Sequence, residues 1–174
     1  MQLLEKVKKT EFLGREFLAW LWFRAETERG FFDLGENGTA ELWFDGKITL
    51  QSETERGLET ITCTGETPNM EEARFALAEK KEIIQATVKL VIGNNQWSFA
   101  LDSTWMNFKT FKSPKVMQDI GEDPDGLFYE KMFLIEQATS ALDEIYSSFI
   151  NLRISTEWTT QELPELVKWI NQGK

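Results

Sequence analysis

The sequence of 174 residues contains no histidine and only one cysteine, Cys63. Without histidine the chain cannot carry a Ser-His-Asp triad, a Cys-His catalytic pair or a histidine-ligated zinc ion. A single cysteine also excludes CxxC redox chemistry and an intramolecular disulfide, which fits a reducing compartment. Cys63 lies in an alternating strand pattern, and we interpret it as a small buried hydrophobic residue rather than a nucleophile.

Long hydrophobic runs are also missing. No stretch approaches the roughly 20 apolar residues that cross a bilayer, and the start of the chain, MQLLEKVKKTEF, lacks the continuous apolar segment of a secretory signal. No GxxxxGK[ST] or GxGxxG loop occurs, and the acidic loops lack the pattern of an EF-hand. We therefore expect a cytoplasmic protein with no metal site, no cofactor and no catalytic residue.

The sequence is nevertheless rich in core-forming side chains, since 41% of its residues are hydrophobic and 13% aromatic. This composition excludes a disordered acidic tail and suits one domain over residues 1–174. A subdivision near residues 65–70 is left open.

Hydrophobic periodicity predicts an α+β fold with mainly antiparallel sheets. Short turns rather than crossover helices join the strands, which favours antiparallel pairing. We expect helices over 11–28, 70–80, 127–152 and 161–171, a loop over 118–126, and strands over 31–34, 40–44, 47–52, 58–64, 82–92, 96–101 and 105–111.

Two glycines deserve a specific interpretation. Asp45-Gly46 indicates a tight hairpin turn between two of the expected strands, because such turns need positive φ. Gly14 lowers helix propensity within the first helical segment. Either that helix begins at Gly14, or another segment packs closely against its backbone.

Charge is unevenly distributed along a chain whose formal net charge is −10. Residues 31–72 hold two basic and ten acidic side chains, residues 73–117 hold seven and three, and residues 118–174 hold four and eleven. A basic stretch of this kind can neutralise phosphates and release counterions. We take its members as candidate DNA-binding residues: Arg74, Lys80, Lys81, Lys89, Lys109, Lys112 and Lys115. The plainer alternative is that these side chains form the solvated side of a sheet and its turn.

Seven tryptophans raise the possibility of stacking on bases. We place Trp20, Trp43 and Trp97 in the core, because Trp20 lies in an apolar helical run and the other two in alternating strands. Three others are less constrained by their surroundings and are candidates for contact: Trp105, Trp158 and Trp169.

Several segments resemble one known family. They are LGREFLAWLWFRAE at residues 13–26, EARFALAEKKEIIQATVKL, QWSFALDSTWMNFKTFKSPK, and LDEIYSSFINLRISTEW at the end of the long helix. Together these segments are similar to bacterial RdgC-like recombination-associated proteins, from about residue 13 to residue 158. The resemblance implies a non-enzymatic protein that binds DNA with little sequence preference, forms a dimeric ring around the duplex and restrains RecA-mediated recombination. The chain is much shorter than typical full-length members and resembles their C-terminal portion, which puts ring closure in doubt.

Our leading hypothesis is therefore a non-enzymatic protein that binds duplex DNA, or a recombination protein such as RecA, through one basic face. The alternative is an acidic protein–protein interaction module or inhibitor that contacts a basic partner. An enzyme that uses only Asp, Glu, Lys or Tyr ranks last, because no motif identifies such a site. The long helix and the spare aromatic residues also suggest a homodimer.

Overall fold

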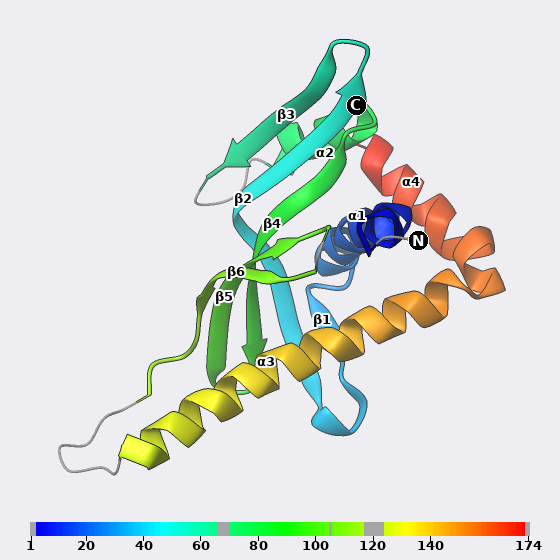
Figure 1. Cartoon of the computed structure of the whole chain (residues 1–174). Helices are drawn as coiled ribbons and strands as arrows, with labels where there is room; N and C mark the ends of the chain where they lie inside the picture. The colour runs from blue at the N-terminus through cyan, green and yellow to red at the C-terminus, as the bar shows by residue number, and fades with distance from the viewer. Residues whose placement is uncertain (1–2, 66–69, 105, 117–123, 173–174) are drawn as a thin grey trace.

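The computed structural model describes residues 3–65, 70–104, 106–116 and 124–172 (Figure 1). It combines helices with one six-stranded sheet, and every strand pair in that sheet is antiparallel. The predicted α+β class is confirmed.

The sheet is built around one long strand. Its six strands are β1 (Phe31–Asp33), β2 (Thr39–Thr54), β3 (Gly57–Thr64), β4 (Glu82–Ile92), β5 (Asn95–Asp102) and β6 (Phe108–Lys112). Along one edge β2 pairs with β4, which continues the sheet through β5 to β6. Along its other edge β2 pairs first with β1 and then with β3. Strands from both sides of residues 65–70 therefore join one sheet.

The prediction of a hairpin turn at Asp45-Gly46 is wrong. β2 runs through this dipeptide as a single strand, and its pairing with β4 shifts between Phe44, opposite Val88, and Ile48, opposite Ala86. Gly46 has φ +82°, which serves a β-bulge as readily as a tight turn. The chain reverses later, where Thr54 pairs with Gly57.

The helices form a layer on the sheet. They are α1 (Leu3–Thr27), α2 (Met70–Ala78), α3 (Pro124–Arg153) and α4 (Leu163–Asn171), with a short helix η1 (Gly35–Asn37) and a π-helical turn η2 (Trp158–Glu162). In Figure 1, α1 packs on β2 and β4, α3 crosses in front of the sheet, and α4 lies beside α1 and α2. Of the loop expected over 118–126, residues 118–123 lie outside the described residues and residues 124–126 begin α3.

The core lies between this helical layer and the sheet. Alternate side chains of β2 and β4 are buried there, as period-two strands require. The alternation in β4 is broken once, between Ile83 and Ala86, where the register with β2 shifts. The largest fully buried side chains include Phe17 and Trp22 from α1, Trp97 and Phe99 from β5, and Phe149 from α3. The indole Nε1 of Trp97 donates a hydrogen bond of 3.1 Å to the carbonyl oxygen of Leu134, which ties α3 to the sheet.

α1 does not begin at Gly14. The helix runs through this position, and a Cβ there would overlap the carbonyl oxygen of Ser103, which follows β5. Close approach of another segment therefore explains the glycine.

The apolar stripe expected along α3 is buried only in part. Leu142, Ile145 and Phe149 belong to the core, whereas Phe128 and Ile135 are exposed. In Figure 1 the first turns of α3 extend beyond the sheet. Ile135 is exposed for another reason: it follows Leu134, which is buried on the sheet side, and so faces away from the sheet. None of the described helices is both long enough and apolar enough to cross a bilayer.

Candidate functional site

Three of the seven candidate DNA-binding residues lie together on one face of the sheet. Lys89 on β4 pairs with Ser98 on β5, which pairs in turn with Lys112 on β6. Lys109 pairs with Ala100, two residues along β5 from Ser98. Because directly opposed residues share a face and the side-chain period along a strand is two, all three lysines project from the same face.

A bulge in β6 makes this arrangement possible. Lys109 and Lys112 are three residues apart, so a regular strand would place them on opposite faces. The β5–β6 register shifts between Ser98 and Ala100, and Thr110 adopts φ +51°, an unusual conformation for a β-branched residue. The extra residue brings both lysines to one face.

This face is opposite the helical layer. The neighbouring strand positions Leu90, Phe99 and Leu101 are buried against the helices, so the alternating positions point the other way. Trp43 on β2 pairs with Lys89 and extends the same row, with 37% of its surface exposed. We call Trp43, Lys89, Ser98, Lys109 and Lys112 the lysine face.

Two carboxylates partly neutralise the lysine face. Lys89 Nζ lies 2.6 Å from Asp45 Oδ2, and Lys109 Nζ lies 2.6 Å from Asp102 Oδ2. Lys112 is exposed and forms no ion pair with any residue that the structure describes. Both ion pairs are accessible to solvent, where such pairs contribute little energy, so the lysines can exchange a carboxylate for another anion.

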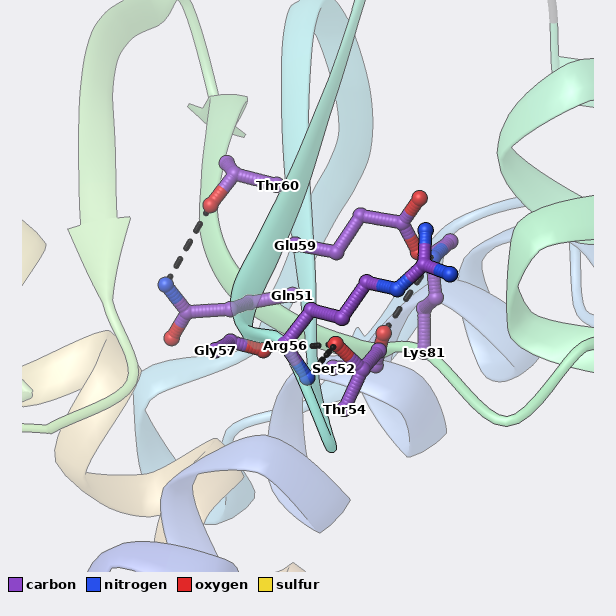
Figure 2. A network of polar contacts seen from close by, with 8 residues as sticks. All are labelled: Gln51, Ser52, Thr54, Arg56, Gly57, Glu59, Thr60 and Lys81. Atoms are coloured by element: carbon purple, nitrogen blue, oxygen red, sulfur yellow. Dashed lines mark hydrogen bonds and ion pairs between the residues drawn. The ribbon is translucent and has the colours of Figure 1, made fainter.

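Arg74 and Lys81 lie on the helical side instead. The Arg74 guanidinium sits 5.2 Å from the centre of the Trp169 ring, and its Nη2 is 3.4 Å from Glu26 Oε2. Lys81 is largely buried, and its Nζ donates to Ser52 Oγ at 3.1 Å and to the Glu59 carboxylate. Figure 2 shows this lysine reaching back to the end of the β2–β3 hairpin.

The last two candidates are exposed and lie outside the strands. Lys80 follows α2 with φ +66°, at the opposite end of β4 from Lys89. Lys115 follows β6. Strand pairing thus brings Lys89, Lys109 and Lys112 together. Arg74, Lys80 and Lys81 lie elsewhere, and Lys115 lies three residues beyond Lys112, after the end of β6.

The tryptophans divide differently from the prediction. Trp20 and Trp97 are buried, as expected, but the placement of Trp43 in the core is wrong, because Leu42 and Phe44 take the inward positions of β2. Trp158 and Trp169, which were candidates for contact, are buried among the helices. Trp105 lies outside the described residues.

Two carboxylates satisfy the indole N–H groups of three buried tryptophans on the helical side. Glu26 accepts hydrogen bonds from the indole groups of Trp22 (2.8 Å) and Trp169 (3.0 Å). Glu162 is buried and accepts from Trp20 Nε1 at 2.7 Å. These carboxylates join α1 to η2 and α4, so their role in the structure is to satisfy indole N–H groups.

The single thiol is also on the helical side. Cys63 is buried on β3, and burial, with a smaller contribution from the charge of Glu72, raises the pKa of its thiol. A raised pKa disfavours the nucleophilic thiolate. Among the described residues no three His, Cys, Asp or Glu side chains gather in a group that could hold a metal ion.

Sequence reasoning missed Trp43 as part of the lysine face, and Asp45 and Asp102 as the carboxylates paired with its lysines. The alternation of Ala40, Leu42 and Phe44 was a usable signal, because it places Trp43 on the outer face. The two carboxylates could not be found in this way, since their pairing depends on contacts between strands.

In comparisons with known proteins, no protein-family model matches the chain, and no curated protein is significantly similar to it.

Proposed function

We propose that the chain is a non-enzymatic protein that binds duplex DNA through the lysine face, with little preference for sequence. The observation that carries the proposal is the convergence of Lys89, Lys109 and Lys112 on the side of the sheet away from the helices. An open sheet face can lie along a phosphate backbone, whereas the helices cover most of the other face.

The side chains of the lysine face suit phosphates better than bases. Lysine is a compact point charge that binds phosphate without reading base edges. Ser98 adds a hydroxyl in the same row. On binding, the lysines would exchange Asp45 and Asp102 for phosphate oxygens, and counterions released from DNA would favour the complex.

The resemblance of residues 13–158 to RdgC-like proteins supports the same class of activity. It extends the proposal to a protein that modulates recombination, through DNA itself or through a recombination protein such as RecA. A protein with this role would act in the cytoplasm, at the nucleoid.

The test is binding of a fluorescently labelled duplex, measured by anisotropy over a series of salt concentrations. The triple variant Lys89→Glu, Lys109→Glu and Lys112→Glu should weaken binding at least tenfold and reduce the salt slope by about 2–3 units, since each neutralised phosphate contributes about 0.9.

A matched control separates the lysine face from the total charge. The variant Lys80→Glu, Lys131→Glu and Lys168→Glu makes the same change in net charge at exposed positions of other elements. This control variant should keep most of the affinity for the duplex and most of the salt dependence of binding. Equal losses in the two triple variants, or a folded wild-type protein that does not bind at low salt, would refute the proposal.

A further inference from the structure

The free edge of β3 is unusual for an edge strand. β3 pairs with β2 on one side, and no strand among the described residues pairs with its other side. Its eight residues, GLETITCT, include neither lysine nor proline, two of the residues that natural proteins use to block edge pairing, and their one charged side chain, Glu59, is paired with Lys81. The opposite edge of the sheet has this protection, because β6 carries Lys109 and Lys112.

An apolar hollow lies next to this edge, between β3 and α2. Its volume is about 460 Å³, and Ile61, Phe75 and Ala76 form its apolar part. Ile61 is 37% exposed and Phe75 50% exposed, and Leu58 at the start of β3 is 69% exposed. Large apolar side chains are therefore accessible along both the strand and the helix.

The rim of the hollow is acidic. Glu71 and Glu72 line it from α2 and Glu79 from just after that helix, and among the described residues Lys81 is the only basic side chain that lines it. Lys81 is already paired with Glu59, so its charge is not directed at Glu71 or Glu72. The hollow thus combines an apolar floor with a negative rim.

We propose that β3 and α2 bind an extended, basic segment of another protein, which adds to the sheet as a strand alongside β3. Backbone hydrogen bonds to the free edge supply the common part of the affinity in such complexes. Because side chains alternate along a strand, every second residue of the segment points toward the helical side, beside Ile61 and Phe75. Lysine or arginine side chains there reach Glu71 and Glu72. This inference goes beyond the DNA-binding proposal, and the two surfaces lie on opposite faces of the sheet.

A basic partner is favoured over a second copy of the chain. Two-fold pairing of β3 with the β3 of another copy would bring the acidic α2 helices of both copies side by side. Like charges held close together oppose that arrangement, whereas a basic segment is attracted by the same groups.

The test uses a labelled octapeptide of alternating lysine and valine as the probe, with binding followed by fluorescence anisotropy at low salt. The variant Glu71→Gln with Glu72→Gln should weaken binding about fivefold to tenfold. The control variant Glu36→Gln with Glu144→Gln removes two exposed charges elsewhere and should change it less than about twofold. Circular dichroism checks that both variants are folded.

A second peptide tests strand addition in the unaltered protein. N-methylation of alternate backbone amides keeps the charge and the side chains but removes the donors that would face β3. We expect this peptide to bind at least about tenfold more weakly than the unmethylated one. Equal binding of the two peptides, equal losses in the two glutamine variants, or no binding of the unmodified peptide would each overturn the proposal. Self-association of the wild-type protein that Glu71→Gln with Glu72→Gln strengthens would overturn it in favour of a second copy, because removing the like charges eases two-fold pairing of β3.

Discussion

At the scale of single residues, the structure assigns physical reasons to positions that look alike in the sequence. Gly14 and Gly126 both lie inside helices. Only Gly14 faces another segment, the carbonyl of Ser103, whereas nothing lies near a Cβ built at Gly126. The lack of a side chain is therefore required at one position and dispensable at the other.

Gly14→Ala should lower the free energy of unfolding by about 2–3 kcal/mol, because the new methyl group would displace packed backbone. Gly126→Ala should raise it by about 0.5–1 kcal/mol, the difference in helix propensity. Urea denaturation followed by circular dichroism measures both changes. Equal effects of the two substitutions would show that α1 and Ser103 are not in close contact.

Cys63 should react slowly in the folded protein. Its thiol pKa is raised, first by burial and then by Glu72, so a smaller fraction is thiolate at any given pH and the rise of the rate with pH moves to higher pH. At pH 8 an aromatic disulfide reagent should modify it at least about tenfold more slowly than in urea. Glu72→Gln should increase the folded-state rate. A folded rate equal to the rate in urea would contradict the buried placement of this residue.

At the scale of elements, the periodicity of hydrophobic residues in the sequence predicted most of the helices and strands. The strand expected over 82–92 is β4, with the same bounds, because five apolar side chains alternate along it. The prediction of a turn at Asp45-Gly46 failed because a β-bulge and a hairpin turn both use a glycine with positive φ. What separates them is the register with β4, a contact between distant parts of the sequence.

The site was less predictable than the elements for the same reason. The sequence predicts that Val88 and Leu90 are buried, and because side chains alternate along a strand, Lys89 between them is expected on the outer face. That Lys109 and Lys112 share this face depends on the bulge at Thr110, which has no local signal in the sequence. The pairing of Lys89 with Asp45 and of Lys109 with Asp102 likewise appears only in three dimensions.

Glu26 should be important for holding α4 in place. Glu26→Ala leaves two buried indole N–H groups and Arg74 without their acceptor, so the free energy of unfolding should fall by about 2–3 kcal/mol. Glu26→Gln keeps an acceptor oxygen and should cost about 1 kcal/mol. Urea denaturation followed by tryptophan fluorescence measures both. A loss below about 0.5 kcal/mol for Glu26→Ala would refute this role.

At the scale of the whole molecule, the described residues present the lysine face, the edge formed by β3 and α2, and the exposed first turns of α3. The last carries a set of exposed apolar side chains: Phe128, Tyr129, Met132, Phe133 and Ile135. The lysine face and the acidic edge carry charge, whereas this surface is mainly apolar. It is the natural place for the homodimer that the sequence suggested.

We expect the protein to sediment at about twice its 20.2 kDa mass at concentrations near 100 µM. Phe128→Ser with Phe133→Ser should shift it to the monomer, because the pair removes the aromatic part of the interface. Ile154→Ser with Val167→Ser removes exposed apolar side chains elsewhere and should leave the dimer intact. Analytical ultracentrifugation measures the mass of each protein in solution. A wild-type protein that is monomeric at this concentration would contradict the expectation.

The central claim is that DNA lies on the lysine face. The most direct measurement is the change in backbone amide NMR signals when a duplex of about twelve base pairs is added to isotope-labelled protein. We predict that the largest changes map to β4, β5 and β6 around Lys89, Ser98 and Lys112, with little change in α2 and α4. Changes concentrated on the helical side, or none at low salt, would contradict the account.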